Sequence, residues 1–457
     1  MGPKNLRDLR VIVVGAGFAG LTAAIECRLR GMHSILVESH PTSRDYGDIL
    51  DFSPNGGMHF ERWADGKVVR KLMEVCLNDT DTLDYYKYDG TLLFSEPFLL
   101  KPEDYYRLLA GHRGEMHQII CDYAEEIGVE MRFGQKVVQY LDSDEKLGVL
   151  VASGEEILGD VVVAADGPKS LAREQVLGLP ESKVNSGYAI YRAYYNLTDE
   201  HRENPLMAPF CRKSPNVARL WVGSHLHMFV YSWKEGKDIG WVFTHKDDED
   251  IGESWSYPGN ITDALAYLDA AHFEPTCKEI VRQTPPEKLV DYKLVWRDPL
   301  KTWLSPSFRS CVIGDAAHCH LPTSAQGACQ AVEDGVVLAV CLDKAGGDVP
   351  LALRVFERVR FNRSHVIHMS SVSVRDDYHF LDFESELFRE NPGIVSVPRQ
   401  AWVLDFDARK DAEENFERLA GDVRSGKEGT LEELALPAGG DFELENRDYY
   451  GPQKASL

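Results

Sequence analysis

The chain has 457 residues, enough for two or three packed units, and its 73 acidic and 50 basic residues give a formal net charge of −23. Such an acidic surface repels nucleic acid and anionic membranes, so we expect neither as a partner. Its nine cysteines form no C-x-x-C pair, and no apolar run reaches the length of a membrane span. We therefore expect a cytoplasmic protein without a disulfide framework, as a monomer or weak dimer.

The first motif is "VIVVGAGFAGLTAAIECRLRGMHSILVESH", in which an apolar strand at 11–14 leads into G-x-G-x-x-G, a helical pattern and a second strand. Gly15 allows the tight turn, Gly17 lets the backbone approach a pyrophosphate, and Gly20 lets helix and strand pack closely. Glu38 ends the second strand and can accept hydrogen bonds from ribose hydroxyls. The stretch predicts a dinucleotide site at a helix N-terminus.

A second motif, "DGPKSLAR", follows the apolar strand predicted at 161–165. Asp166 and Gly167 end that strand. Ser170 and Arg173 then lie three residues apart, which places them on one face of a short helix.

The third motif is "GDAAHCHLPTSAQGACQAVEDG" at 314–335, which turns between Pro322 and Gly327 into a helical pattern. Its run His318-Cys319-His320 suggests a metal site when read alone. An i, i+2 histidine pair on a loop, with no third ligand nearby, fits metal-site spacing poorly. We predict no metal, and a zinc hydrolase is disfavoured.

Together, in this order, the three motifs resemble those of the single-component (group A) FAD-dependent aromatic monooxygenases related to p-hydroxybenzoate and salicylate hydroxylases. The resemblance implies bound FAD, with NADPH or NADH as a transient reductant, and a small aromatic substrate oxygenated by O2 through a flavin C4a-hydroperoxide. It also implies a set of FAD contacts beyond the first motif, namely Arg113, Asp166, Asp315, Pro322, Gly327 and Ala328.

This chain departs from the family pattern in the third motif. Ala325 stands where the family has a glycine, and His320 and Thr323 are also atypical. We expect these departures to face the substrate.

The resemblance predicts an α/β fold: a Rossmann-like FAD domain with a mixed or parallel sheet, an antiparallel substrate sheet, and C-terminal helices. Alternating aromatic stretches such as "GYAIYRAYYNL" favour the antiparallel strands, and "LDYYKYDGTLLF" favours a hairpin in the same sheet. The predicted boundaries are 1–80, 104–176 and 297–350 for the FAD domain, 81–103 and 177–296 for the substrate sheet, 351–423 for the helices, and 424–457 for a loosely ordered tail.

Two residues are candidates for the chemistry. Asp48 lies in "GDILDFSPNGG", where the family places a loop near the flavin ring, although a loop-capping role is equally open. Arg192 lies within an aromatic strand. Alternation places it on one face with Ile190 and Tyr194, opposite Tyr191.

The chain is most similar to the fungal secondary-metabolism branch, in particular to indole-alkaloid oxidases of the paraherquamide type. That likeness implies indole 2,3-epoxidation followed by rearrangement to a spiro-oxindole. A phenol or salicylate-type hydroxylase is the nearest alternative, and a non-catalytic flavoprotein is the alternative of another class.

Overall fold

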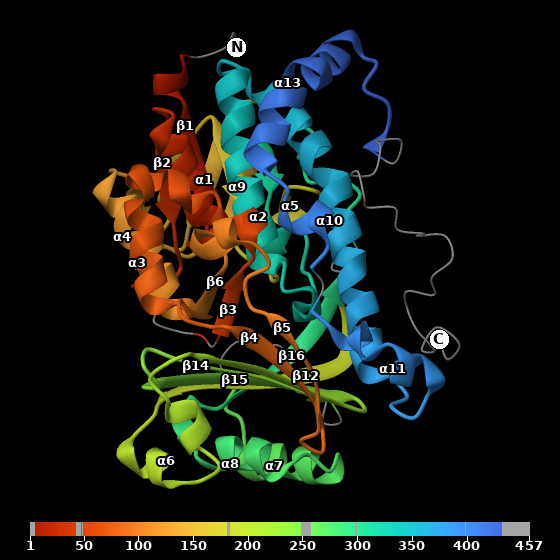
Figure 1. Ribbon diagram of the computed structural model, residues 1–457. Coiled ribbons are helices and arrows are strands. Elements are labelled where there is room, and N and C mark those ends of the chain that lie inside the picture. The colour runs from red at the N-terminus through yellow and green to blue at the C-terminus, as the bar shows by residue number, and fades with distance from the viewer. Residues whose placement is uncertain are drawn as a thin grey trace.

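The computed structural model describes residues 5–42, 47, 49–180, 183–247, 257–297, 299–397 and 399–431 (Figure 1). Asp48 and the tail from 432 to 457 lie outside the described residues. Helices pack around a parallel sheet in one half of the molecule, and a broad twisted sheet forms the other half. None of the helices in the described ranges is long and apolar enough to cross a membrane.

Five parallel strands form the central sheet of the first half, in the order β17-β11-β1-β2-β7. They come from distant parts of the chain: β1 (Arg10–Val14), β2 (His33–Val37), β7 (Glu130–Arg132), β11 (Val161–Ala164) and β17 (Ser310–Val312). Their apolar residues are almost completely buried, as expected for a parallel sheet covered on both faces. This arrangement confirms the α/β class and the discontinuous Rossmann-like unit.

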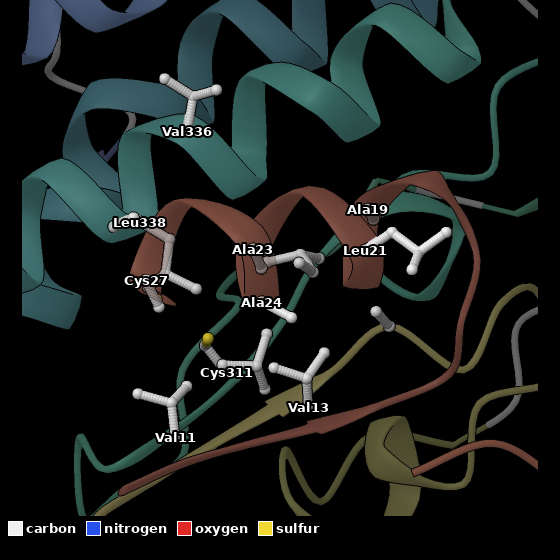
Figure 2. Close-up of a cluster of buried hydrophobic side chains, with 14 of the residues drawn as sticks. Val11, Val13, Ala19, Leu21, Ala23, Ala24, Cys27, Cys311, Val336 and Leu338 are labelled. Atoms are coloured by element: carbon white, nitrogen blue, oxygen red, sulfur yellow. The ribbon is translucent and has the colours of Figure 1, made fainter. Parts of the chain in front are cut away.

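One face of this sheet packs on α1 (Phe18–Leu29), which in turn packs on α9 (Gly327–Lys344). Figure 2 shows the layers, with Val11, Val13 and Cys311 beneath α1 and with Val336 and Leu338 above it. Both helices have small residues at this contact. Because α9 begins in the third sequence motif, its packing on α1 brings that motif close to the first one.

The remaining elements of this half surround the core or connect it to the second sheet. Their bounds are α2 (Pro54–Gly57), α3 (Lys67–Val75), α4 (Arg113–Glu126), α5 (Ala172–Gln175), the β3–β6 pair (Ile49–Phe52 and Leu109–His112), and the antiparallel strands β8 (Val137–Asp142), β9 (Leu147–Val151) and β10 (Glu156–Leu158).

The second half is a seven-stranded sheet in the order β16-β12-β15-β14-β13-β4-β5. Its strands are β4 (Thr82–Lys87), β5 (Leu92–Pro97), β12 (Lys183–Asn196), β13 (Val217–Gly223), β14 (Leu226–Trp233), β15 (Asp238–Lys246) and β16 (Val290–Arg297). The predicted β4–β5 hairpin is confirmed. The sheet is not wholly antiparallel, however: β4 pairs with β13 in parallel, and a long stretch of chain connects the two strands.

Helices cover the outer face of this sheet and connect its edge to the first half. The outer face carries α6 (Asp199–Glu203), α7 (Ile261–Ala270) and α8 (Pro275–Arg282). The 31-residue helix α10 (Val349–His379) runs from α9 down to the sheet (Figure 1). It is followed by α11 (Glu386–Glu390), α12 (Ala401–Leu404) and α13 (Ala408–Ser425).

Candidate active site

The first motif forms the turn between β1 and α1, and each glycine has a distinct environment. Gly15 has φ +99°, and a Cβ atom there would lie 2.4 Å from the carbonyl oxygen of Ala165. At Gly20, a Cβ would lie 2.0 Å from the carbonyl oxygen of Gly15. At Gly17, by contrast, no atom of the described residues lies within 4 Å of the Cβ position. Two glycines therefore permit close packing, and the third leaves the backbone open.

Glu38 lies beside this turn at the end of β2. Its carboxylate accepts hydrogen bonds of 2.8 Å from the backbone N–H groups of Ala16 and His40. These bonds hold the side chain next to the open turn, where an acidic residue can bind a ribose.

The second motif contacts the third through Arg173. Its guanidinium donates to the carbonyl oxygen of Ala316 at 3.1 Å and also to the carbonyl of Pro168. Asp166, at the end of β11, accepts a 2.8 Å hydrogen bond from the Tyr140 hydroxyl. Burial raises the pKa of Asp166, and hydrogen bonds from Ser170 and Tyr140 oppose that rise. The two sequence motifs thus form one connected structure around the end of the parallel sheet.

His318 interacts with Asp334 within this part of the fold. Its Nε2 lies 2.6 Å from Asp334 Oδ2, which also accepts the Gly314 backbone N–H at 2.9 Å. Within the described ranges, no group of three His, Cys, Asp or Glu side chains could hold a metal ion. The histidine therefore fixes the loop after β17 through Asp334.

The N-terminus of α9 is open. No side chain caps the helix at Gln326, and no described atom lies within 4 Å of a Cβ at Gly327. The preceding turn from Pro322 ends at Ala325, which has φ +51°. Among the described residues the first turn of α9 at Gly327 and Ala328 is thus uncapped, and the helix dipole there favours an anionic group.

Two charged residues, Arg113 and Asp315, interact electrostatically in this part of the fold. Arg113 begins α4, and its guanidinium lies 5.5 Å from the ring centroid of Phe18 at the start of α1. Asp315 lies in the loop after β17. Burial raises the pKa of the Asp315 carboxyl, and electrostatic interactions with His318 and Arg113 oppose the rise.

Two of the atypical residues in the third motif, Thr323 and His320, contact α10. The Thr323 hydroxyl donates to the Ser371 carbonyl oxygen on α10 at 2.5 Å. The His320 ring lies between those of His318 and His368, with centroid distances of 4.8 and 5.0 Å. Both side chains pack towards α10, and the expectation that they face the substrate stays a prediction.

The inner face of the seven-stranded sheet is directed towards the first half of the molecule. Ile49 of β3 packs directly on Gly240 of β15: a Cβ atom on Gly240 would lie 2.4 Å from Ile49 Cγ2. Tyr194 stacks on His112 at 4.0 Å between centroids, and His112 Nε2 lies 3.2 Å from the Gly47 carbonyl oxygen. The segment on either side of Asp48 therefore adjoins the inner face.

Arg192 lies on this inner face together with Ile190 and Tyr194, as the alternation predicts. Its guanidinium lies 5.5 Å from the ring centroid of Tyr292 on the neighbouring strand β16. Residues on the opposite face, including Tyr191, pack with apolar side chains of α7 and α8. Most of the sheet is buried, but five side chains at the centre of the inner face remain partly exposed. They are Ile190, Arg192, Tyr194, Phe229 and Val242.

Comparison with known proteins identifies the chain. Models described as FAD binding domains match residues 10–58 and 267–375. Notoamide E oxidase from Aspergillus sp. (strain MF297-2) is 32% identical over 443 residues, covering 96% of this chain and 95% of that protein. The chain belongs to the group A FAD-dependent monooxygenase family. Another member, the FAD-dependent monooxygenase nanF from Aspergillus nanangensis, is 30% identical over 95% of both chains.

Solved structures agree with this assignment. The crystal structure of CtdE in complex with FAD and a substrate has a TM-score of 0.85 and 30% identity, covering 91% of this chain and 100% of that one. A salicylate hydroxylase substrate complex, at 23% identity and a TM-score of 0.70, shares the fold. The open backbone at Gly17 and Gly327 fits the FAD that these family members bind. The chain is thus an FAD-dependent monooxygenase.

Sequence reasoning missed two groups of residues at this site. Asp51 on β3 contacts Tyr231 of the sheet, with 2.8 Å between its Oδ2 and the hydroxyl. Arg360 and Arg363 on α10 pair with the acidic residues of the third motif. The i, i+3 spacing of the two arginines, which places them on one face of a helix, could have pointed to the second group.

Proposed function

We propose that this monooxygenase uses NADPH or NADH to reduce FAD and then oxygenates an electron-rich aromatic substrate, an indole alkaloid of fungal secondary metabolism. The reaction is 2,3-epoxidation of the indole followed by rearrangement to a spiro-oxindole. The observation that carries the proposal is the position of Arg192, a partly exposed cation with the aromatic and aliphatic side chains of Tyr292 and Val242 beside it on the inner face.

The proposed FAD site is built from the three motifs. The turn at Gly15, Gly17 and Gly20 approaches the pyrophosphate, and Glu38 accepts from the adenosine ribose. Further contacts come from the residues that surround the open helix ends, namely Arg113, Asp166, Asp315, Pro322, Gly327 and Ala328. Bound FAD supplies the activation of O2 once it has been reduced.

The chain's own contribution to oxygenation is to place the substrate, exclude water and stabilise developing charge. Ile190, Phe229 and Val242 offer apolar surface to an aromatic ring, which excludes water from the site. The Arg192 guanidinium has N–H donors and no acceptor, so it acts by donating a hydrogen bond to the oxygen of the opening epoxide. Asp48 is proposed as an acidic partner in the adjoining loop.

The name of one relative supports an oxidation in fungal secondary metabolism. Notoamide E oxidase, 32% identical, is named for the oxidation of notoamide E. Its match covers nearly the whole of both chains, which includes the inner face of the sheet as well as the FAD motifs.

The test replaces Arg192 by alanine and measures product from indole alkaloids and from a phenol series. We expect loss of indole oxygenation with FAD still bound. Arg219→Ala is the matched control, because Arg219 lies on the outer face of the same sheet, 5.2 Å over the Phe210 ring. Unchanged turnover in Arg192→Ala would refute the role of Arg192. If the wild-type enzyme oxygenates phenols but not indoles, the aromatic hydroxylase is favoured.

A further inference from the structure

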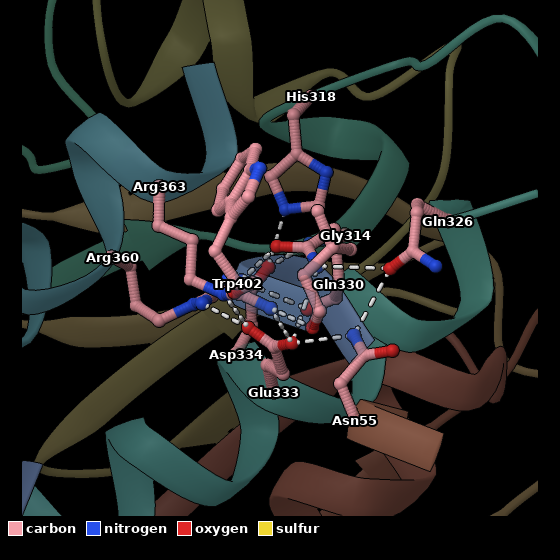
Figure 3. Close-up of polar contacts among 11 residues, drawn as sticks. Asn55, Gly314, His318, Gln326, Gln330, Glu333, Asp334, Arg360, Arg363 and Trp402 are labelled. Atoms are coloured by element: carbon pink, nitrogen blue, oxygen red, sulfur yellow. Dashed lines mark hydrogen bonds and ion pairs between the residues drawn. The ribbon is translucent and has the colours of Figure 1, made fainter. Parts of the chain in front are cut away.

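A cluster of buried charges lies behind the flavin-binding segments (Figure 3). Glu333 and Asp334 on α9 are fully buried, and so is Arg360 on α10, while the Arg363 side chain is only 2% exposed. Two carboxylates face two guanidiniums, so the formal charges of these four side chains balance. Charges buried this deeply are tolerated only when each is paired and hydrogen-bonded.

Arg360 contacts three acceptors on α9 at once. Its Nε donates to Asp334 Oδ1 at 2.8 Å, one Nη donates to Glu333, and the other donates to Gln330 Oε1 at 2.7 Å. Arg363 binds Glu333 in a fork, with two contacts of 2.8 Å, and also donates to the carbonyls of Trp402 and Val403. Both arginines therefore fix the carboxylates in one orientation.

Each carboxylate then contacts a segment of the flavin site. Asp334 Oδ2 accepts from the Gly314 backbone N–H and lies 2.6 Å from His318 Nε2, which holds the loop that contains Asp315. Glu333 Oε1 accepts from Asn55 Nδ2 at 2.7 Å.

Asn55 extends the second connection to the open end of α9. The same Nδ2 donates to Gln326 Oε1 at 3.0 Å, and Gln326 Nε2 donates to the Ser53 hydroxyl at 3.3 Å. Gln326 directly precedes Gly327. Ser53 directly follows β3, and Asn55 lies in the short helix α2. The cluster thus connects α10 to the loop after β17, the N-terminus of α9 and the segment after β3.

Pairing outweighs burial in setting the ionisation of this cluster. Burial alone would raise the pKa of Glu333, but Arg363 and Arg360 overcome it and lower the pKa to about 2. The pKa of Asp334 is also lowered, because His318 and Arg360 outweigh its burial. Both carboxylates are ionised at any working pH, so the hydrogen bonds that they accept persist.

We propose that Arg360 is a positioning residue of the flavin site, acting with Arg363 through Glu333 and Asp334 to hold the loop after β17 and the first turn of α9 in the geometry that binds FAD. The C-terminal helical segment is thereby part of the flavin-binding machinery. The proposal rests on FAD binding alone and is independent of the substrate and of Arg192.

The test compares Arg360→Met and Arg360→Lys with a matched control, Arg409→Met. Arg409 is also a largely buried arginine, bonded to the fully buried Glu26 at 2.6 and 2.7 Å on the side of α1 away from the glycine turn. After its removal, Glu26 still keeps Arg30 and Trp63 as partners. Likewise, Glu333 keeps Arg363 when Arg360 is removed.

Purified holoenzymes are diluted, and the fluorescence of released FAD gives the dissociation constant, while visible circular dichroism reports the geometry of the bound flavin. We expect at least a tenfold higher dissociation constant for Arg360→Met and a smaller rise with an altered spectrum for Arg360→Lys. Lysine keeps the charge but cannot reach all three acceptors. Arg409→Met is expected to stay within twofold of the wild type.

Should Arg360→Met fail to fold, Arg360→Lys decides the question, because it retains the buried positive charge. The proposal is overturned if the folded Arg360 variants bind FAD within twofold of the wild type with an unchanged spectrum. It is equally overturned if Arg409→Met loses as much FAD affinity as the Arg360 variants.

Discussion

Asp51 carries a pH-dependent cost to stability that can be removed by one substitution. It lies on β3 where that strand meets the inner face of the seven-stranded sheet, and the Tyr231 hydroxyl donates to its Oδ2 at 2.8 Å. Burial raises its pKa from the ordinary 3.8 to about 6, despite opposition from that hydrogen bond and from Arg399. The ionised form is therefore less stable in the folded protein than in the unfolded chain.

The sign and size of the effect follow from linkage. The folded state holds the Asp51 proton more tightly, so stability falls as pH rises between the two pKa values of 3.8 and about 6. At 1.36 kcal/mol for each pKa unit, the cost amounts to roughly 1.6 kcal/mol at pH 5 and at most about 3 kcal/mol at pH 8. Asp51→Asn keeps an acceptor for Tyr231 but cannot ionise, so it avoids this cost.

Thermal unfolding of wild type and Asp51→Asn should be followed from pH 5 to pH 8. The stability advantage of the variant should grow by roughly 1.4 kcal/mol across this range. With an unfolding entropy of about 2.1 cal/mol/K per residue, that growth corresponds to a relative rise in Tm of roughly 1.4 °C for the whole chain.

Glu26→Gln provides a control of opposite sign. The pKa of Glu26 is lowered, because Arg30, Arg409 and a hydrogen bond from Trp63 outweigh its burial. Its neutralisation should therefore destabilise the protein at neutral pH. An Asp51→Asn variant whose advantage over wild type is the same at pH 5 and pH 8 would refute the reasoning.

Three further substitutions separate packing from ligand binding. Gly17→Ala should leave the Tm of the FAD-free protein unchanged, since its Cβ meets no described atom within 4 Å, but it should weaken FAD binding more than tenfold. A loss of Tm as large as that of Gly20→Ala would contradict this expectation. Gly20→Ala should lower that Tm, because its Cβ would lie 2.0 Å from the Gly15 carbonyl oxygen, with a cost of roughly 1–3 kcal/mol or more. Thr323→Val removes the hydrogen bond to Ser371 and should cost about 1 kcal/mol in unfolding experiments without changing KM, whereas a severalfold higher KM would place Thr323 at the substrate.

The FAD-binding half was predictable because its signals are local. A buried strand, a glycine turn and a helix at fixed spacing satisfy requirements of the backbone itself, such as the positive φ of Gly15 and the space beside Gly20. The alternation around Arg192 likewise follows from the two-residue period of a strand, and the structure confirms which side chains share its face.

The same period could not say which face meets the flavin. The large aromatic side chains of the sheet divide between its two faces: Trp241 and Phe243 pack under α7 and α8 on the outer face, whereas Tyr231 and Trp233 lie on the inner face. The inner face is set by the packing of β3 against Gly240, a contact between residues almost two hundred positions apart. The domain boundaries, the roles of the site residues and the role of Asp48 stay predictions.

By itself, the sequence determined the α/β class, the FAD site and the family, since these depend on short motifs whose residues meet local steric and electrostatic needs. Only the tertiary structure decided that β4 pairs in parallel with β13, that Thr323 and His320 turn towards α10, and that Arg360 neutralises Asp334. These contacts join distant segments. Which partners meet depends on how whole helices and sheets pack, and no local pattern along the chain encodes that choice.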